Sequence, residues 1–174
     1  GQDNHLKQAL ASYHGAGIYA KYFDGNTDFL EDNDFITFEM EQIANNKNAI
    51  VPTLSYLFHK LEIEKFTGRP TLLTLDECWL FLDNPIFSAK IREWLKVLRK
   101  KNVGVIFATQ SLADIANSNI LSAVLDSCYS RIYLPNASAN EQKDLYKIFG
   151  LNETEIQILR NAIPKRQYYY KNPN

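Results

Sequence analysis

A short apolar run that ends in two adjacent carboxylates constrains the fold of this chain more than any other stretch. Residues 71–75 read Thr-Leu-Leu-Thr-Leu, and Asp76 and Glu77 follow directly. Such a nearly continuous apolar run predicts a strand that is covered on both faces, as in parallel sheets. Residues 103–108 read Val-Gly-Val-Ile-Phe-Ala and predict a second strand of the same kind, which is followed by residues 109–111, Thr-Gln-Ser.

The clearest helix of the chain lies between these two strands. It begins at Asn84-Pro85, and positive charge at 99–101 in its last turn complements the helix dipole. Its apolar residues fall on one stripe, which consists of Phe87, Ile91, Trp94, Leu95 and Leu98. A strand, a helix and a strand with short connections predict a βαβ unit, in which the strands pair in parallel through a right-handed crossover.

The rest of the sequence continues this alternation of helices and strands more loosely. Further helices are expected at 3–13, 50–66, 112–125, 139–149 and 152–161, and further strands at 35–40, 130–134 and 167–170. The fold class is therefore α/β with a mainly parallel sheet. Because no repeat, low-complexity tract or linker interrupts the chain, we expect residues 1–174 to form a single domain.

Composition excludes several classes of protein. With 174 residues, of which 45% are hydrophobic, the chain can bury a substantial core, and no apolar window approaches the length of a membrane-spanning helix. A net charge of −1 gives no global attraction to nucleic acid or acidic lipid, so such contacts require a local patch. Cys78 and Cys128 lack metal-binding spacing, which favours buried free thiols in a reducing compartment. The three histidines are scattered and suggest no metal ligands.

The two carboxylates after the first strand are the strongest candidate for chemistry. In open parallel sheets, ligands bind at the carboxyl ends of the strands. A buried strand that delivers Asp and then Glu is the Walker B arrangement of nucleotide hydrolases. Asp76 then helps to hold Mg²⁺, and Glu77 orients or deprotonates the attacking water. Gln110, at the end of the neighbouring strand, could reach the same phosphate and water; the alternative is that Gln110 and Asp76 cap local turns.

Two groups of cations leave alternatives open. Residues 99–101, Arg-Lys-Lys, form either a charged helix end or a contact to the phosphates of DNA or of a nucleotide in a neighbouring subunit. Lys165 and Arg166 stand beside three consecutive tyrosines, 168–170. This segment is either a packed strand with solvated charges or a basic and aromatic surface for nucleic acid.

One expected motif is absent from the sequence. The phosphate-gripping loop G-x-x-x-x-G-K-[ST] does not occur, and none of the seven glycines is followed by lysine. That loop supplies the backbone N–H groups and the lysine that hold nucleotide phosphates. One half of a nucleotide site is therefore missing from this polypeptide.

Taken together, these motifs resemble one known family. The matching segments are Leu75-Asp76-Glu77-Cys78-Trp79, residues 87–102 (FSAKIREWLKVLRKKN), Phe107-Ala108-Thr109-Gln110-Ser111, Leu134-Pro135-Asn136 and, upstream, residues 22–25 and 37–40. In order and spacing they resemble the carboxyl-terminal ATPase domain of the CagE/TrbE/VirB conjugal-transfer and type IV secretion family. The resemblance covers essentially the whole chain.

The resemblance implies a partial RecA-like P-loop NTPase fold of three layers, from an ATPase that powers pilus assembly or substrate transfer. It implies ATP and Mg²⁺ as cofactors of the full-length protein, with Asp76 on the Mg²⁺ side, Glu77 catalytic and Gln110 sensing the γ-phosphate. Arg99 or Arg166 would act across a subunit boundary. The implied partners are further copies of the chain and other secretion components at the cytoplasmic face of the inner membrane.

The family also places a Walker A strand and loop before the segments that match, so we expect this chain to be a fragment that is inactive on its own. Two other functions stay open. A DNA-pumping motor or coupling protein of the same fold would share the Walker B and sensor positions and would contact DNA directly. A catalytically silent interaction module would only dock to secretion partners.

Overall fold

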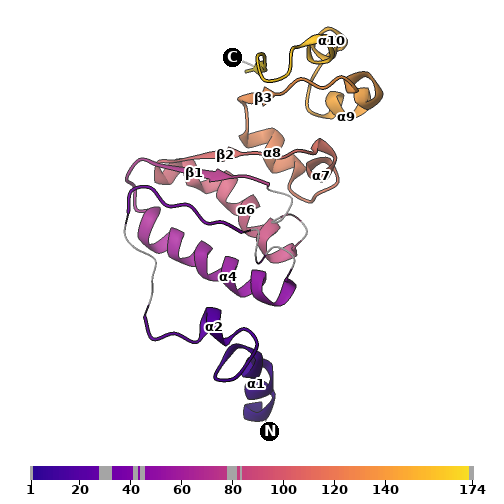
Figure 1. The fold of residues 1–174 in the computed structure, drawn as a ribbon. Coiled ribbons are helices and arrows are strands. Elements are labelled where there is room, and N and C mark those ends of the chain that lie inside the picture. Colours follow the sequence, from indigo (N-terminus) through magenta and orange to yellow (C-terminus); the bar gives the residue numbers. More distant parts are fainter. Residues whose placement is uncertain are drawn as a thin grey trace. The chain divides into compact units, whose positions relative to one another are not determined.

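The computed structural model describes residues 2–27, 33–40, 43, 46–77, 82 and 84–172. The chain divides into two compact units, 1–53 and 54–174, and each is described here by itself (Figure 1). The expectation of a single domain over 1–174 stays a prediction. None of the helices in the described ranges is both long enough and apolar enough to cross a membrane.

The first unit is built around a small cluster of aromatic rings. It contains α1 (Gln2–Leu10), the 3₁₀ turn η1 (Ala11–Tyr13) and α2 (Ala20–Phe23), so the helix expected at 3–13 is confirmed. The ring of Tyr13 lies 5.4 Å from that of Tyr19 and 5.5 Å from that of Phe23. The Tyr13 hydroxyl donates a hydrogen bond to the carbonyl of Asn48 over 2.8 Å. These contacts hold the helical start of the chain to the segment that begins the next helix.

The strand predicted at 35–40 is wrong. These residues form a bend and irregular chain, and the side chain of Phe35 is 87% exposed. Aromatic and β-branched residues favour strands because they pack against a neighbouring strand. No strand of the described chain pairs with residues 35–40. Without a partner strand, their aromatic and β-branched composition is not sufficient to form a strand.

The second unit has an aromatic core between two helices. The helix α4 (Lys47–Lys60) continues into the π-helical turn η2 (Leu61–Lys65), and α6 (Pro85–Val97) begins at the predicted Asn84, whose side chain caps the backbone N–H of Ile86 at 2.9 Å. The ring of Trp94 lies 4.6 Å from that of Phe58 and 5.3 Å from that of Phe66. These rings join α6 to the segment that precedes the first strand.

The Trp94 side chain is buried but keeps its polar group satisfied. Its indole N–H donates to the Glu62 carboxylate at 2.7 Å, and the same carboxylate pairs with the Lys90 ammonium at 2.6 Å. Burial of the Glu62 carboxyl would raise its pKa, but the hydrogen bonds from Lys90 and Trp94 outweigh that effect and hold the pKa below its usual value. The buried indole N–H of Trp94 is therefore satisfied by a charge-assisted hydrogen bond and is not left unpaired.

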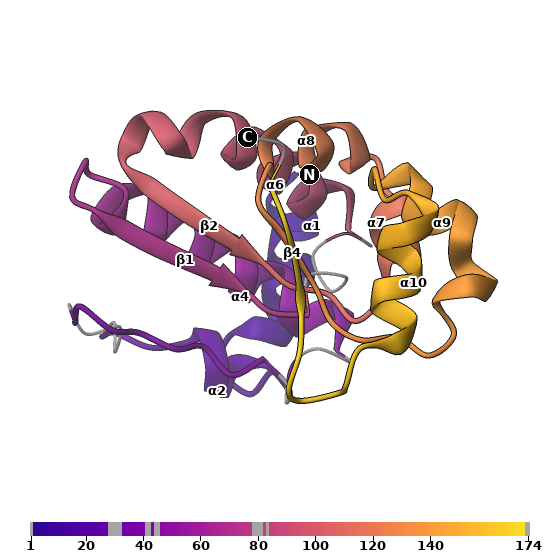
Figure 2. The same cartoon turned by 90° about the horizontal axis from the view of Figure 1, so that it is seen from above.

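The predicted βαβ unit is present, with its two strands in parallel. Strand β1 (Thr71–Leu75) pairs with β2 (Val103–Phe107), in a register that runs from Thr71 opposite Val103 to Leu75 opposite Phe107 (Figure 2). Helix α6 and the 3₁₀ turn η3 (Leu98–Lys101) connect them. Because both strands end at the same edge, the residues that follow each of them are brought together.

The described residues cover the β1–β2 pair on one face only, so the predicted coverage of both faces is wrong. Leu72 is 66% and Ile106 is 49% exposed, whereas Leu75 and Val103 are buried. Successive side chains of a strand point to opposite faces, and Figure 1 shows α6 on one side of these strands. A run of apolar residues indicates that a strand is hydrophobic, but it does not indicate whether residues of this chain cover both of its faces.

The second half of this unit forms a separate antiparallel ribbon with its own helices. Strand β3 (Arg131–Tyr133) pairs with β4 (Tyr169–Lys171), which confirms both predicted strands within a few residues. The helices are α7 (Leu112–Ala116), α8 (Leu121–Ser127), α9 (Lys143–Ile148), which follows the 3₁₀ turn η4 (Ala139–Gln142), and α10 (Glu153–Asn161). The single helix expected at 112–125 is divided, because the Ser118 hydroxyl donates to the carbonyl of Ile115 at 2.7 Å within a turn.

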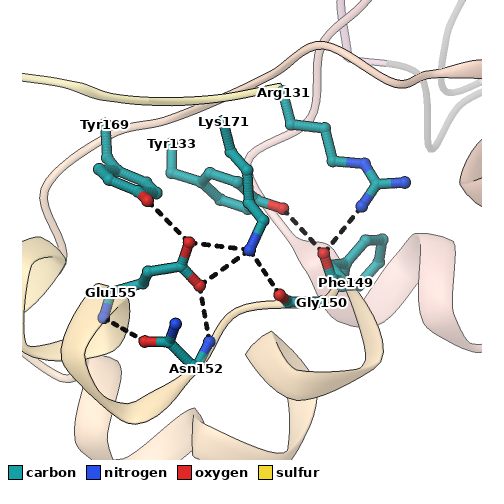
Figure 3. Close-up of polar contacts among 8 residues, drawn as sticks. All are labelled: Arg131, Tyr133, Phe149, Gly150, Asn152, Glu155, Tyr169 and Lys171. Carbon is teal, nitrogen blue, oxygen red and sulfur yellow. Dashed lines mark hydrogen bonds and ion pairs between the residues drawn. The ribbon is translucent and has the colours of Figure 1, made fainter. Parts of the chain in front are cut away.

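Two cations fasten the ribbon to the helices beneath it (Figure 3). Arg131 and Lys171 lie opposite each other in register, where like charges repel, but each is drawn to a different set of acceptors. The Arg131 guanidinium donates to the carbonyls of Leu125 (3.1 Å), Cys128 (3.0 Å) and Phe149 (2.8 Å). It therefore ties together the carboxyl-terminal ends of α8 and α9, where cations are favoured.

Lys171 joins β4 to the start of α10 through Glu155. The Lys171 ammonium lies 2.8 Å from the Glu155 carboxylate and 2.6 Å from the Gly150 carbonyl. The same carboxylate accepts hydrogen bonds from the Tyr169 hydroxyl and from the backbone N–H of Asn152, both at 2.7 Å. The last of these completes a capping box, in which the Asn152 side chain accepts the backbone N–H of Glu155 in return. One carboxylate thus serves as cap, ion-pair partner and acceptor.

The described cysteine, Cys128, is a free thiol but is only half-buried, whereas the sequence predicted that it is buried. Burial raises its pKa, and the nearby charge of Arg131 lowers it by a smaller amount. A thiol with a raised pKa is a poor nucleophile at neutral pH. Cys78 lies outside the described residues.

Replacing Trp94 with alanine tests the aromatic core. Trp94 is 2% exposed, so we expect Trp94→Ala to lower the free energy of unfolding by about 3–5 kcal/mol. Ile86→Ala is the control, because Ile86 lies on the same helix and is 64% exposed. Urea denaturation followed by circular dichroism measures both; a loss below about 1 kcal/mol for Trp94→Ala would contradict this core.

Acid titration tests the role of Glu155. Burial alone would raise the pKa of this carboxyl, but the hydrogen bonds from Lys171, Asn152 and Tyr169 hold the pKa below its usual value. A lowered pKa in the folded chain stabilises it fully above the unfolded value of about 4.3, and this stabilisation is lost as the pH falls through the folded pKa. We therefore expect the stability of the native sequence to fall more steeply below about pH 5 than that of Glu155→Gln.

The matched control for this titration is Glu141→Gln, which removes an exposed carboxylate that takes part in none of the described ion pairs. Its stability should follow the native curve. Thermal melts between pH 3 and pH 7 compare the stability of the three proteins. If stability falls equally with pH in the native protein and in Glu155→Gln, the lowered pKa of Glu155 does not stabilise the fold.

Candidate functional site

The parallel register brings the predicted site residues to one edge of the sheet. Leu75 and Phe107 lie opposite each other at the carboxyl ends of β1 and β2, and the backbone N–H of Ala108 still donates to the Leu75 carbonyl at 2.9 Å. Asp76 and Glu77 follow at one strand end, and both are exposed. The predicted convergence at this edge is therefore seen in the structure.

Glu77 and Gln110 meet across this edge. The Gln110 side-chain amide donates to the Glu77 carboxylate at 3.4 Å, although 33 positions separate the two residues in sequence. Glu77 adopts a left-handed backbone conformation, with φ at 49°. This conformation costs an L-residue other than glycine roughly 1–2 kcal/mol, and such backbone strain is concentrated at functional sites.

Asp76 partly fulfils the alternative role of capping a turn. Its carboxylate oxygen Oδ1 accepts the backbone N–H of Glu77 at 2.9 Å. This bond engages one of its two oxygens and fixes the carboxylate beside the left-handed residue. The side chain remains exposed, so an oxygen is still available to a ligand.

The turn after β2 is held by residues other than Gln110. The Thr109 hydroxyl accepts the backbone N–H of Ser111 and donates to its carbonyl, both at 3.1 Å. The Ser111 hydroxyl in turn accepts the N–H of Asp114 at 3.4 Å and begins α7. The proposal that Gln110 caps this loop is therefore not what the structure shows. Sequence reasoning missed Thr109, although Thr and Ser two residues apart are a signal for such a turn.

Of the two candidate arginines, Arg99 lies away from the carboxylates of its own chain. Arg99 belongs to η3, which Asn102 follows, and the Asn102 carbonyl accepts the N–H of Thr71 at the start of β1. Arg99 therefore lies at the opposite end of the strands, roughly 16 Å of strand away at about 3.3 Å per residue. Arg166 lies in the turn before β4. No described ion pair joins either arginine to Asp76 or Glu77.

The chemistry of the donor set fits a divalent cation that is shared with phosphates. Mg²⁺ binds oxygen ligands and commonly takes one or two carboxylates, with waters and substrate phosphates completing its shell. Asp76 and Glu77 supply such oxygens at an exposed edge. Within the described ranges, no group of three or more His, Cys, Asp and Glu side chains is arranged to hold a metal alone. The edge can therefore assist a metal that arrives with a phosphate ligand.

Comparison with known proteins gives one strong family match. The profile of the TraG P-loop domain family matches residues 3–172. The chain is 43% identical over 175 residues to a probable conjugal transfer protein TrbE of Sinorhizobium fredii, in a match that covers 99% of this chain and 26% of that protein. It is 43% identical over the same length to "Conjugal transfer protein TrbE" of Rhizobium radiobacter, of which it covers 21%.

More distant relatives extend the same pattern. The chain is 33% identical over 144 residues to "Type IV secretion system protein virB4" of Bartonella quintana, in a match that covers 82% of this chain and 18% of that protein. The structure of VirB4 of Thermoanaerobacter pseudethanolicus superposes with a TM-score of 0.69 at 21% identity, over 94% of this chain and 48% of that one. This likeness confirms the predicted fold class, a partial RecA-like P-loop NTPase fold. The chain spans about a quarter or less of the length of these curated relatives.

Replacing Glu77 with glycine tests the left-handed backbone. Glycine adopts this conformation without steric cost, which offsets its larger entropy in the unfolded chain. We expect Glu77→Gly to leave the free energy of unfolding unchanged or to raise it by up to about 1 kcal/mol. Glu93→Gly, on an exposed position of α6, should lower it by about 1 kcal/mol. Denaturant titration measures the free energy of unfolding of both variants. Equal losses in Glu77→Gly and Glu93→Gly would show that the backbone of Glu77 is not strained.

Proposed function

Because the chain belongs to the TraG P-loop domain family, we propose that it is the water-activating part of the ATPase domain of a type IV secretion and conjugal-transfer motor. This membership confirms the family that the sequence motifs predicted. In this function, ATP hydrolysis powers pilus assembly or substrate transfer. This choice of process is supported by the relatives that are named as conjugal transfer and type IV secretion proteins.

The observation that carries this proposal is the meeting of Glu77 and Gln110 at the carboxyl edge of two parallel strands. Their side chains lie 3.4 Å apart. An acceptor and an amide at one strand edge are the groups needed to hold a water in line with a terminal phosphate.

Each residue has a separate task in this mechanism. When bound, Mg²⁺ and ATP supply the transferable phosphoryl group and the positive charge that stabilises it. Asp76 would hold the Mg²⁺ ion. Glu77 orients the attacking water and accepts its proton. Gln110 would donate its amide hydrogen to the water or to a phosphate oxygen, which would let it sense whether the terminal phosphate is present.

The phosphate-gripping half of the site must come from residues outside these 174. The sequence contains no Walker A loop, and the curated relatives are about four times longer or more. The β1–β2 edge can activate water, but without that loop little holds the triphosphate. The chain alone should therefore hydrolyse ATP slowly or not at all.

Oligomerisation would complete the site in another way. An arginine from a neighbouring copy can stabilise the charge that develops on the γ-phosphate. Arg99 and Arg166 are both exposed, and Arg99 is too far from its own chain's carboxylates to act within one copy. The motor would assemble with other secretion components in the cytoplasm, at the periphery of the inner membrane.

Replacing Glu77 with glutamine tests the proposed role. The protein for this test is the chain joined to a Walker A segment, because its own 174 residues contain none. We expect Glu77→Gln to lower kcat for ATP hydrolysis by about 100-fold or more, because general-base catalysis contributes 10²–10⁴-fold. ATP binding should be retained. A phosphate-release assay measures kcat. Undiminished hydrolysis by Glu77→Gln would show that Glu77 is not the catalytic carboxylate.

Three controls accompany this assay. Glu141→Gln changes an exposed carboxylate outside the site and should keep full activity. The 174-residue chain without a Walker A segment should show little or no turnover, and robust turnover by it would contradict the divided site.

Arg99→Ala and Arg166→Ala identify the arginine that acts between copies. The variant that lacks this arginine should be inactive by itself. Mixing it with Glu77→Gln should restore activity, because the Glu77→Gln copies still supply the arginine.

A further inference from the structure

The β3–β4 ribbon is anchored on one face, and in the part of the chain that the structure describes its other face is uncovered. Arg131, Tyr133, Tyr169 and Lys171 point to the anchored face, where they contact the helix ends and Glu155 (Figure 3). Side chains alternate along a strand, so the residues between them point away from these helices. Because the ribbon is fixed from beneath, its outer face is held in one shape.

The outer face carries a row of large apolar and aromatic side chains. Ile132 is 64% and Tyr170 is 52% exposed, and the two lie opposite each other in register. Leu134 is 71% and Tyr168 is 67% exposed. We call these four residues the ribbon face. The Tyr170 hydroxyl is held by Ser130 at 3.3 Å and by the Asn172 amide at 3.2 Å, so this ring is presented in a defined position.

A rigid turn with two cations adjoins the ribbon face. The Gln167 side chain accepts the backbone N–H of Ile163 at 2.7 Å, while its own backbone N–H donates back to the Ile163 carbonyl at 3.0 Å. Lys165 adopts a left-handed φ of 62° within this turn. Lys165 and Arg166 are exposed, and neither takes part in an ion pair among the described residues. The turn therefore presents two uncommitted positive charges.

Shallow recesses lie on both sides of Arg166 and Tyr168. One, of about 600 Å³, is bordered by Ile158 and Asn161 of α10, and the other, of about 520 Å³, by Leu134 and Pro164. Among the residues that the structure describes, no carboxylate lines either recess. The acidic residues at the start of α10 are already paired, Glu153 with Lys143 and Lys147, and Glu155 with Lys171. The surface is locally positive although the whole chain is not.

We propose that the ribbon face and the cations Lys165 and Arg166 bind single-stranded nucleic acid. Exposed aromatic rings beside lysine and arginine, without carboxylates, suit bases that stack and phosphates that pair with the cations. A single strand fits because its bases are free to stack on Tyr168 and Tyr170, whereas a duplex hides them. The proposal does not depend on ATP hydrolysis, so it can be tested on this chain alone.

Fluorescence anisotropy with a labelled oligothymidine of about twenty nucleotides tests the surface. We expect the chain to bind it at about 50 mM salt and more weakly at about 200 mM. Tyr168→Ala should weaken binding by about 5-fold or more, because one stacked base is lost, whereas Tyr168→Phe should retain most of the affinity. The double variant Lys165→Gln/Arg166→Gln should weaken binding and reduce the slope of log K against log salt by about 1.4, or about 0.7 for each phosphate contact.

The matched control is Lys100→Gln/Lys101→Gln, which removes two exposed cations at the amino-terminal end of β2. It should bind like the native chain. Circular dichroism confirms that each variant is folded, as expected because the altered side chains are exposed. Absence of binding at low salt, or a loss confined to the Lys100/Lys101 variant, would overturn the proposal. So would self-association that Tyr168→Ala abolishes without oligothymidine binding, since the ribbon face would then join copies of the chain.

Discussion

The parallel pairing of β1 and β2 is the constraint on which the candidate site depends. With Leu75 opposite Phe107, both strands end at the same edge, and the residues that follow them meet. A shift of one residue would reverse the faces of every side chain in β1. The Glu77–Gln110 contact at 3.4 Å follows from this register. The aromatic core around Trp94 packs α6, which connects the two strands, against the end of α4.

The other half of the second unit is organised by charge rather than by apolar packing alone. The cations Arg131 and Lys171 satisfy carbonyls at helix ends, and Glu155 receives one of these cations together with a backbone N–H and the Tyr169 hydroxyl. Since these groups occupy the inner face of a two-stranded ribbon, its apolar residues are left outside. The anchoring and the exposed ribbon face therefore have the same cause, which is the alternation of side chains along β3 and β4.

Patterns that act over short range predicted much of the structure. The start of α6 at Asn84, the helix at 152–161 and the βαβ unit all appear as expected, because they depend on neighbouring residues and on the helical or strand period. The strand at 35–40 failed because a strand needs a partner that composition does not reveal. The helix at 112–125 was divided by the Ser118 turn, and the exposed face of β1 reflects a covering layer that the described residues do not supply.

By itself, the sequence determined the residues of the candidate site and the family, since Asp76, Glu77 and Gln110 follow apolar strands in a recognisable order. Only the tertiary structure decided how they meet: through the left-handed backbone of Glu77 and the turn that Thr109 and Ser111 hold. It also separated Arg99 from the carboxylates and turned Tyr168 and Tyr170 outward. The physical reason is that residue type sets what a side chain can do, whereas register and anchoring contacts between distant residues set where it points.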